Sequence, residues 1–233
     1  MSSEQEPSES RTRLFAPLRE HAERLSSSFE GIIPPHREAG ETLARWIAAN
    51  YQPGVPLDLI VVCTGNSRRS ILGSSMGNLA AAYYGMPEIR FHSGGTAPTA
   101  FNPRTASALK AIGFVIIPTG DEAERGEAEL ENPVFRVEWG NGLEMLEFSK
   151  HYGDSSNPQS GFAALMVCGE ADEGCPMVDG ASLRVSVPFE DPKSFDGDPS
   201  EGEKYGERRD GIGRLLLSVM MQARELLTAQ EER

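Results

Sequence analysis

The stretch of this chain with the clearest chemical potential is one in which a cysteine precedes an arginine by six positions. It runs from Cys63 to Arg69 and Ser70, directly after the apolar run 57–62. A loop between a strand and a helix brings backbone N–H groups and the helix N-terminus to one point, where a tetrahedral oxyanion can bind without a metal. The same positive field favours the thiolate form of Cys63, which is the form that attacks.

Other residues of this loop have types that suit an oxyanion cradle. Arg69 can offer a planar fork to two oxyanion oxygens, which lysine cannot do. Ser70 is placed to hydrogen-bond the Cys63 sulfur, and Gly65 and Asn66 are residue types that tolerate a left-handed backbone. The predicted oxyanion-binding residues are Thr64, Gly65, Asn66, Ser67, Arg68, Arg69 and Ser70.

The chain has two further cysteines, Cys168 and Cys175, in a second cluster at 167–176. An odd number of cysteines in a long chain with no recognisable export signal argues against a structural disulfide framework and leaves redox or catalytic use. A nucleophilic thiol with two further thiols placed as a relay suits a reductase as well as a phosphatase.

The elements that must position these residues alternate between strands and helices. A strand at 57–62, a helix from Ile71 that Gly85 terminates and a strand at 88–93 imply a parallel crossover. Strands at 163–167 and 183–187 lead to Cys168 and to Asp191, so both polar segments are expected at the carboxyl edge of an open sheet, where ligands bind. Further helices are expected from Asn102-Pro103 and over 206–230.

Two regions depart from this alternation. Residues 1 to about 11 are predicted to be disordered, and two helices joined through 31–35 follow them. The acidic run 121–131 reads as a solvated loop, and the segments 134–139 and 143–148 alternate around Gly-Asn-Gly as a β-hairpin does. We therefore divide the chain into an N-terminal extension, residues 1–56, and a catalytic domain, residues 57–233.

Length and composition are those expected of a cytoplasmic enzyme. The 233 residues, 39% of them hydrophobic, can bury one sizeable core. No apolar stretch reaches the length of a membrane span, and the first residues lack the pattern of a signal peptide. A formal charge of -13 disfavours nucleic acid or an anionic membrane as partner. We expect neither a metal nor a cofactor.

With these motifs in place, the chain resembles the low-molecular-weight tyrosine phosphatase superfamily over roughly 57–230, and within it the thioredoxin-linked arsenate reductases. The resemblance rests on four landmarks in order: the segment 63–70, Asn102-Pro103, the cluster Cys168-x6-Cys175-Pro176, and Asp191-Pro192. It implies a three-layer α/β fold with a four-stranded parallel sheet. The N-terminal helices and the hairpin would be additions to that fold.

The resemblance also implies the roles of the site residues. Cys63 would be the nucleophile, Arg69 the oxyanion clamp and Asp191 the acid over the site, while Cys168 and Cys175 would form the thiol relay of an arsenate reductase. Its partners would be arsenate and thioredoxin or a similar dithiol protein. A phosphate-monoester hydrolase that works through a phosphocysteine is the alternative, and a redox or oxyanion sensor without turnover is a third.

Two features depart from the family pattern. Arg68 replaces the small or apolar residue that is common before the essential arginine. Asp191-Pro192 is followed by Lys193, Ser194 and Phe195 rather than by the paired tyrosines of the phosphotyrosine branch.

Overall fold

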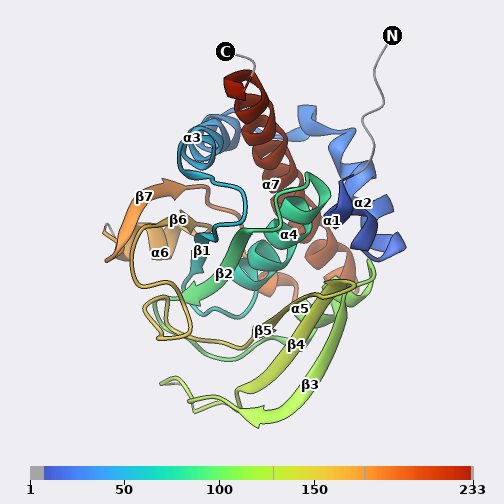
Figure 1. Ribbon diagram of the computed structural model, residues 1–233. Coiled ribbons are helices and arrows are strands. Elements are labelled where there is room, and N and C mark those ends of the chain that lie inside the picture. Colours follow the sequence, from blue (N-terminus) through green and yellow to red (C-terminus); the bar gives the residue numbers. More distant parts are fainter. Residues whose placement is uncertain (1–7, 128, 176, 232–233) are drawn as a thin grey trace.

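A four-stranded sheet forms the centre of the molecule in the computed structural model, which describes residues 8–127, 129–175 and 177–231 (Figure 1). Its strand order is β2-β1-β6-β7, and all three neighbouring pairs are parallel. The two inner strands are almost entirely buried, as expected where both faces of a parallel sheet are covered. The strands are β1 (Leu57–Cys63), β2 (Ile89–Gly95), β6 (Phe162–Met166) and β7 (Ala181–Ser186). The predicted four-stranded parallel sheet is confirmed.

Helices flank this sheet, and three long ones pack on one another beside it. Helix α4 (Arg69–Tyr83) lies against β1 and β2, and α7 (Glu201–Glu231) packs between α4 and α3 (Pro34–Asn50) (Figure 1). Glycines let α4 approach the strands closely, because a Cβ at Gly73 would lie 2.6 Å from a Val61 methyl and one at Gly77 would overlap the Phe91 ring. The predicted helices after the cysteine loop and at the end of the chain are therefore confirmed.

The N-terminal segment holds more helix than the sequence predicts. Helices α2 (Ala16–Ser26) and α3 are the two expected ones, joined by the 3-10 turn η1 (Phe29–Gly31). The prediction of disorder to about residue 11 is wrong for residues 8–11, because α1 (Glu9–Arg13) begins behind a Ser8 cap. Buried Ser10 donates to the carbonyl oxygen of Ala82 at 2.9 Å and fixes this turn to α4. Residues 1–7 of that prediction lie outside the described residues.

A second, antiparallel sheet lies beside the first and has the order β3-β4-β5. Its strands are β3 (Val115–Glu122), β4 (Pro133–Gly140) and β5 (Leu143–Glu147). The predicted hairpin is confirmed as β4 and β5, but it is not alone, since β3 pairs with β4 and includes the start of the acidic run predicted as a loop. β3 is an exposed edge strand with a proline and a glycine, and it buries only Ile116, so its sequence lacks a clear alternation.

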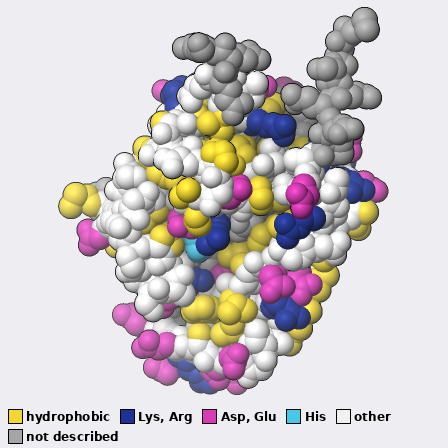
Figure 2. All heavy atoms as spheres, viewed as in Figure 1, with side chains coloured by type: hydrophobic (Ala, Val, Ile, Leu, Met, Phe, Trp, Pro, Cys, Tyr) yellow, Lys and Arg dark blue, Asp and Glu magenta, His cyan; other side chains and the backbone are white. Residues whose placement is uncertain are grey.

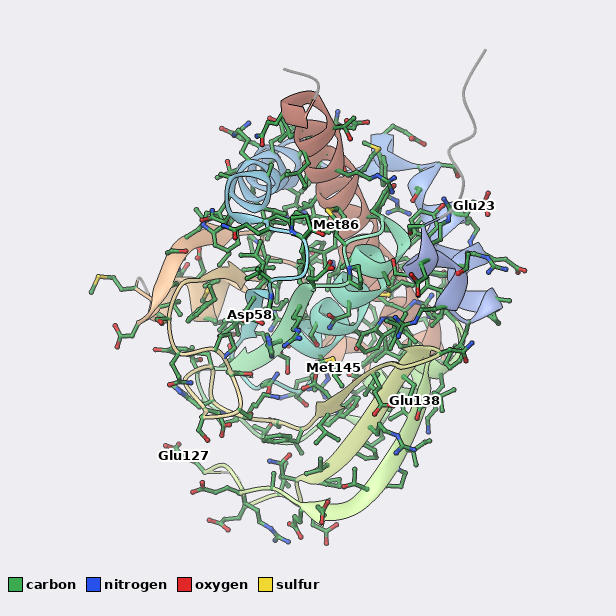
Figure 3. The ribbon with its side chains drawn as sticks, in the orientation of Figure 1. Glu23, Asp58, Met86, Glu127, Glu138 and Met145 are labelled. Carbon is green, nitrogen blue, oxygen red and sulfur yellow. The ribbon has the colours of Figure 1, made fainter. Side chains whose placement is uncertain are left out.

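The second sheet is anchored to the first layer through β5. The Met145 side chain, labelled in Figure 3, lies with its sulfur 3.4 Å from the Asn78 amide nitrogen on α4. Asn78 in turn donates to the carbonyl oxygen of Phe91 at 2.7 Å and accepts from its N–H at 3.1 Å, which ties α4 to β2. The same side chain therefore joins a helix, a parallel strand and the antiparallel sheet.

Three short elements complete the carboxyl edge of the parallel sheet. They are α5 (Pro103–Lys110), α6 (Gly169–Gly174) and the 3-10 turn η2 (Pro192–Phe195). Asn102 caps α5 by accepting from the Arg104 N–H at 2.9 Å, as its Asn-Pro start predicts. Among the described residues no helix has both the length and the apolar character needed to cross a membrane.

Candidate active site

The predicted nucleophile and its loop lie at the carboxyl edge of the parallel sheet. Cys63 is the last residue of β1, its side chain is buried, and its sulfur lies 3.1 Å from the Ser70 hydroxyl in the first turn of α4. Asn66 has a left-handed backbone with φ 39°. Gly65 is not among the glycines with positive φ, and a Cβ there would lie 3.3 Å from the Thr99 hydroxyl. The curled loop between strand and helix therefore depends on Asn66 for its left-handed residue.

A buried hydrogen-bond network holds Asn66 in this conformation. Its amide nitrogen donates to the hydroxyls of Ser70 and Ser93, both at 2.8 Å, and its amide oxygen accepts from the Lys150 N–H at 2.7 Å. Asn66 is fully buried. One side chain thus links the loop to β2 and to the segment after β5, and it bonds the same hydroxyl that contacts the Cys63 sulfur.

Glu147, at the end of β5, extends this network into the second sheet. Its carboxylate is fully buried and accepts from Ser93, from Ser74 of α4 at 2.9 Å and from the Lys150 ammonium at 3.5 Å. A buried ion pair of this kind needs hydrogen bonds to offset desolvation, and the two serines supply them. Sequence reasoning missed this pair. The available signal was a glutamate at an inward position of the predicted hairpin, in alternation with Leu143 and Met145.

The Arg69 side chain binds Asp191, which lies at the start of η2. One terminal nitrogen donates to the carbonyl oxygen of Phe189 at 2.9 Å and the other to the Asp191 carboxylate at 2.7 Å, while its Nε is buried with no partner among the described residues. Asp191 caps η2 by accepting from the Lys193 N–H at 3.0 Å. The predicted clamp and the predicted acid are therefore in direct contact.

Arg68, predicted to bind the oxyanion, has its guanidinium directed elsewhere. Its Nε donates to the Tyr205 hydroxyl at 2.6 Å and one terminal nitrogen to the Asp196 carboxylate at 2.7 Å. Two of its three nitrogens are thus engaged with α7 and the end of η2.

The two other cysteines lie at opposite ends of α6. Cys168 is fully buried at the helix start, and its sulfur lies 3.3 Å from the Thr64 hydroxyl of the loop. That hydroxyl also lies 3.3 Å from the Glu170 carboxylate. Cys175 follows the last helical residue, and its thiol donates to the carbonyl oxygen of Met177 at 2.9 Å. All three cysteines are free thiols, and Cys168 contacts the loop through Thr64.

A cleft of about 900 Å³ opens over the loop. It is lined by Cys63, Thr64, Gly65, Ser67, Arg68, Arg69, Ala97, Thr99, Gly169, Glu170, Asp191, Lys193 and Ser194. The loop, the start of α6 and η2 therefore face a common space, large enough for an oxyanion with a substituent.

Local cations counter the acidic charge of the whole chain at this cleft. Burial lowers the pKa of Arg208 on α7, against the attraction of Glu190, and repulsion by the Arg69 charge lowers it further. Arg208 is therefore close enough to Arg69 for the two charges to repel, although the cations that line the cleft are Arg68, Arg69 and Lys193; sequence reasoning missed Arg208. On the face seen in Figure 2, Lys and Arg side chains lie among Asp and Glu side chains.

Comparison with known proteins gives structural neighbours only. No protein-family model matches the chain, and no curated protein matches it. The solution structure of a low-molecular-weight protein tyrosine phosphatase from Bacillus subtilis has 17% identity and a TM-score of 0.42, over 76% of this chain and 100% of that one. The crystal structure of YfkJ from Bacillus subtilis has 14% identity and a TM-score of 0.41, over 78% and 99%.

A third structural neighbour is an arsenate reductase. The thioredoxin-dependent arsenate reductase of Corynebacterium glutamicum has 16% identity and a TM-score of 0.39, over 88% of this chain and 96% of that one. Identities this low do not carry a reaction from these proteins to the chain. The chain is thus similar to solved structures of a low-molecular-weight tyrosine phosphatase and of an arsenate reductase.

Proposed function

We propose that this chain is an enzyme in which the Cys63 thiolate attacks a tetrahedral oxyanion, and that the oxyanion is arsenate, which is reduced to arsenite. The observation that carries the proposal is the contact of the Cys63 sulfur with Ser70 at the start of α4, in a cleft that also holds the Arg69–Asp191 pair. A nucleophile, an oxyanion clamp and an acid are the groups that such a displacement needs.

Oxyanion binding would change the partners of Arg69. Its buried Nε has no partner in the described part of the chain, so an oxyanion oxygen would satisfy it, and the fork would exchange its bond to Asp191 for a second oxygen. Asp191, released from the cation, could then carry the proton that the leaving oxygen needs.

The reduction would proceed in balanced steps. Cys63 forms a bond to arsenic as one oxygen leaves as water, with a proton from Asp191. The Cys168 thiolate then attacks the Cys63 sulfur, and the electron pair of the sulfur–arsenic bond goes to arsenic. Arsenic gains two electrons and leaves as arsenite, while the two sulfurs become a disulfide. The contact of Cys168 with Thr64 supports its role as the attacking thiol.

Cys175 would resolve this disulfide, which requires α6 to change shape. Six helical residues separate the two cysteines, so their Cα atoms are about 10 Å apart along the helix, beyond the roughly 7 Å limit for a disulfide. Glycines at both ends of this short helix make its unwinding cheap. Cys175 would then attack Cys168 and release Cys63 as the thiolate, and thioredoxin or a similar dithiol protein would reduce the Cys168–Cys175 disulfide.

Hydrolysis of phosphate monoesters is the second candidate. The separation of Cys168 from Cys175 favours it, because a phosphatase would use Cys63, Arg69 and Asp191 in the same way and needs no movement of α6. Water would then attack a phosphocysteine, and the other two thiols would be unchanged.

Thiol titration separates the two reactions. Reduced protein is incubated with arsenate and no reductant, and free thiols are counted. We expect one turnover to remove two of the three thiols and the Cys175→Ser protein to give a Cys63–Cys168 disulfide by peptide mass mapping. Constant thiols with steady aryl-phosphate hydrolysis would establish the phosphatase instead. If the protein neither loses thiols with arsenate nor hydrolyses aryl phosphates, both proposed activities are wrong.

A further inference from the structure

The two ends of the turn η2 are held by two consecutive arginines of the oxyanion loop. Asp191 caps the beginning of η2 and pairs with Arg69 at 2.7 Å. Asp196 follows its last residue and pairs with Arg68, also at 2.7 Å. The turn that carries the proposed acid is therefore attached to the loop at two points, and only one of them involves the proposed oxyanion clamp.

The attachment at Asp196 is a closed ring of three side chains. Arg68 donates to the Tyr205 hydroxyl at 2.6 Å, and that hydroxyl donates to Asp196 at 2.7 Å. Arg68 and Asp196 close the ring directly. Tyr205 is 1% exposed, whereas the Arg68 and Asp196 side chains are 14% and 24% exposed, so the Tyr205 hydroxyl is the member of the ring best shielded from water.

The ionisation states keep this ring intact at neutral pH. Burial, with the hydrogen bond to Asp196, raises the pKa of Tyr205 to about 12, so its hydroxyl keeps the proton that it donates. Burial would raise the pKa of Asp196, but the hydrogen bonds from Tyr205 and Arg68 outweigh it and lower that pKa. Asp196 is therefore a carboxylate that accepts from both neighbours.

The attachment at Asp191 is different, because it cannot last through the proposed reaction. An oxyanion that binds the Arg69 fork takes that fork from Asp191. From that moment the beginning of η2 is no longer held by Arg69, although Asp191 must stay over the leaving oxygen to deliver a proton.

We propose that Arg68 is a positioning residue: through Asp196 and Tyr205 it keeps η2, and with it Asp191, over the loop while Arg69 binds the oxyanion. This role rests on the proposed function of the cleft. It also explains why an arginine precedes Arg69, since its guanidinium is already engaged by Asp196 and Tyr205. Direct binding of the oxyanion by Arg68 is the competing role.

Leaving-group dependence distinguishes these roles. Asp196→Asn weakens the ring and leaves every residue of the loop in place. Asp198→Asn is the matched control, because the Asp198 side chain bonds only Ser200 among the described residues. Two substrates are compared: phenyl phosphate, whose leaving group needs a proton, and 2,4-dinitrophenyl phosphate, whose leaving group does not. A misplaced acid should lower kcat about tenfold or more for the first and about twofold at most for the second.

The controls define what would overturn the role of Arg68. Asp198→Asn should match wild type on both substrates, and the affinity of Asp196→Asn for inorganic phosphate should stay within about twofold of wild type. Equal losses on both substrates, or a large loss of phosphate affinity, would assign Arg68 and its ring to oxyanion binding. Wild-type rates in Asp196→Asn on both substrates would show that Arg68 and its ring have no role in the reaction.

Hydrogen exchange tests the tether independently of turnover. With inorganic phosphate bound, amides of residues 191–197 should exchange about tenfold faster in Asp196→Asn than in wild type or Asp198→Asn. Unchanged exchange would overturn the tether even if activity falls. A wild-type protein that neither hydrolyses aryl phosphates nor reduces arsenate would overturn the proposed function, and Arg68 would then have no acid to position.

Discussion

Two of the three Arg69 guanidinium nitrogens donate hydrogen bonds, and the third has no acceptor among the described residues. The third nitrogen is therefore available to an oxyanion. The bonds of Arg69 to Phe189 and Asp191 orient the side chain, whereas its buried Nε has no acceptor among the described residues. A buried unsatisfied donor costs free energy, about 1 to 3 kcal/mol, which an oxyanion would recover on binding. Binding an anion should therefore release more free energy at Arg69 than at an arginine whose nitrogens are all solvated.

Arg69→Lys should lower kcat/KM about a hundredfold or more, because an ammonium cannot bond the Phe189 carbonyl oxygen and two oxyanion oxygens at the same time, as the planar guanidinium can. Activity is measured with aryl phosphate and with arsenate. Arg45→Lys, in an exposed ion pair with Glu41 on α3, is the control and should match wild type. Retention of full activity by Arg69→Lys would show that the clamp lies elsewhere.

Cys63→Ser should lower turnover by roughly a thousandfold or more, because a serine hydroxyl in the same loop stays protonated and attacks poorly. Inorganic phosphate should still bind to the variant, as measured by calorimetry, since the loop amides and Arg69 remain. Turnover near the wild-type rate would contradict the assignment of the nucleophile.

At the scale of elements, the antiparallel sheet supports the loop through hydrogen bonds. Glu147 at the end of β5 bonds Ser93, and Ser93 accepts from Asn66, the left-handed residue of the loop. The conformation of an oxyanion cradle built by β1 and α4 thus depends on a carboxylate from a different sheet. This coupling gives the strands of the antiparallel sheet a structural role at the loop.

Glu147→Gln should lower the free energy of unfolding by about 3 kcal/mol, because it leaves the Lys150 ammonium buried without a counter-charge. Activity should also fall, since Asn66 loses part of its support. Unfolding in urea and kcat/KM are the measurements. Glu144→Gln on the same strand is exposed and should change neither. Equal free energies of unfolding for the two variants would mean that the Glu147–Lys150 ion pair makes no net contribution to stability.

At the scale of the whole molecule, the N-terminal helices share the core of residues 57–233, the part predicted to be catalytic. Leu18 and Leu25 of α2 and Leu43 and Ile47 of α3 are at most 3% exposed. They belong to one cluster of buried residues with the strands of the parallel sheet, and α3 packs along α7. Removal of these helices would expose a large apolar face of α7.

A polar contact also crosses this interface. His21 of α2, 2% exposed, lies 2.9 Å from the Asp210 carboxylate of α7, which accepts from Arg209 at 2.7 Å. Burial would raise the pKa of Asp210, but the hydrogen bonds from His21 and Arg209 outweigh it and lower the pKa to about 2. Arg24 also contacts the His21 ring from the same helix.

Asp210→Asn should therefore lower the free energy of unfolding by about 2 kcal/mol near pH 7. A carboxylate with a depressed pKa stabilises the fold fully above its unfolded pKa of about 4, and this contribution is lost as pH falls through about 2. Urea unfolding of wild type and variant at several pH values measures the difference. A difference that does not shrink between those two pH values would contradict the linkage.

Local sequence determined the parallel sheet and most of the cleft. Strand, loop and helix around Cys63 follow from short-range signals, namely an apolar run, residues that permit tight turns and apolar residues at helical spacing after Arg69. Residues at the carboxyl ends of adjacent parallel strands must meet at one edge, so Cys168 and Asp191 could be placed near Cys63 without coordinates. The ion pair of Arg69 with Asp191 was not predicted and comes from the structure.

Only the tertiary structure decided the remaining partners, because they are contacts between segments far apart in the chain. Glu147 bonds Ser74 of α4, and through Ser93 supports Asn66, only because β5 packs beside α4. Strand β3 joins the hairpin although its own sequence has little alternation. Arg68 in the sequence is one more cation in an oxyanion loop. In the fold its guanidinium is held by Asp196 and Tyr205, which lie about 130 positions along the chain, since side-chain direction depends on the neighbours that packing supplies.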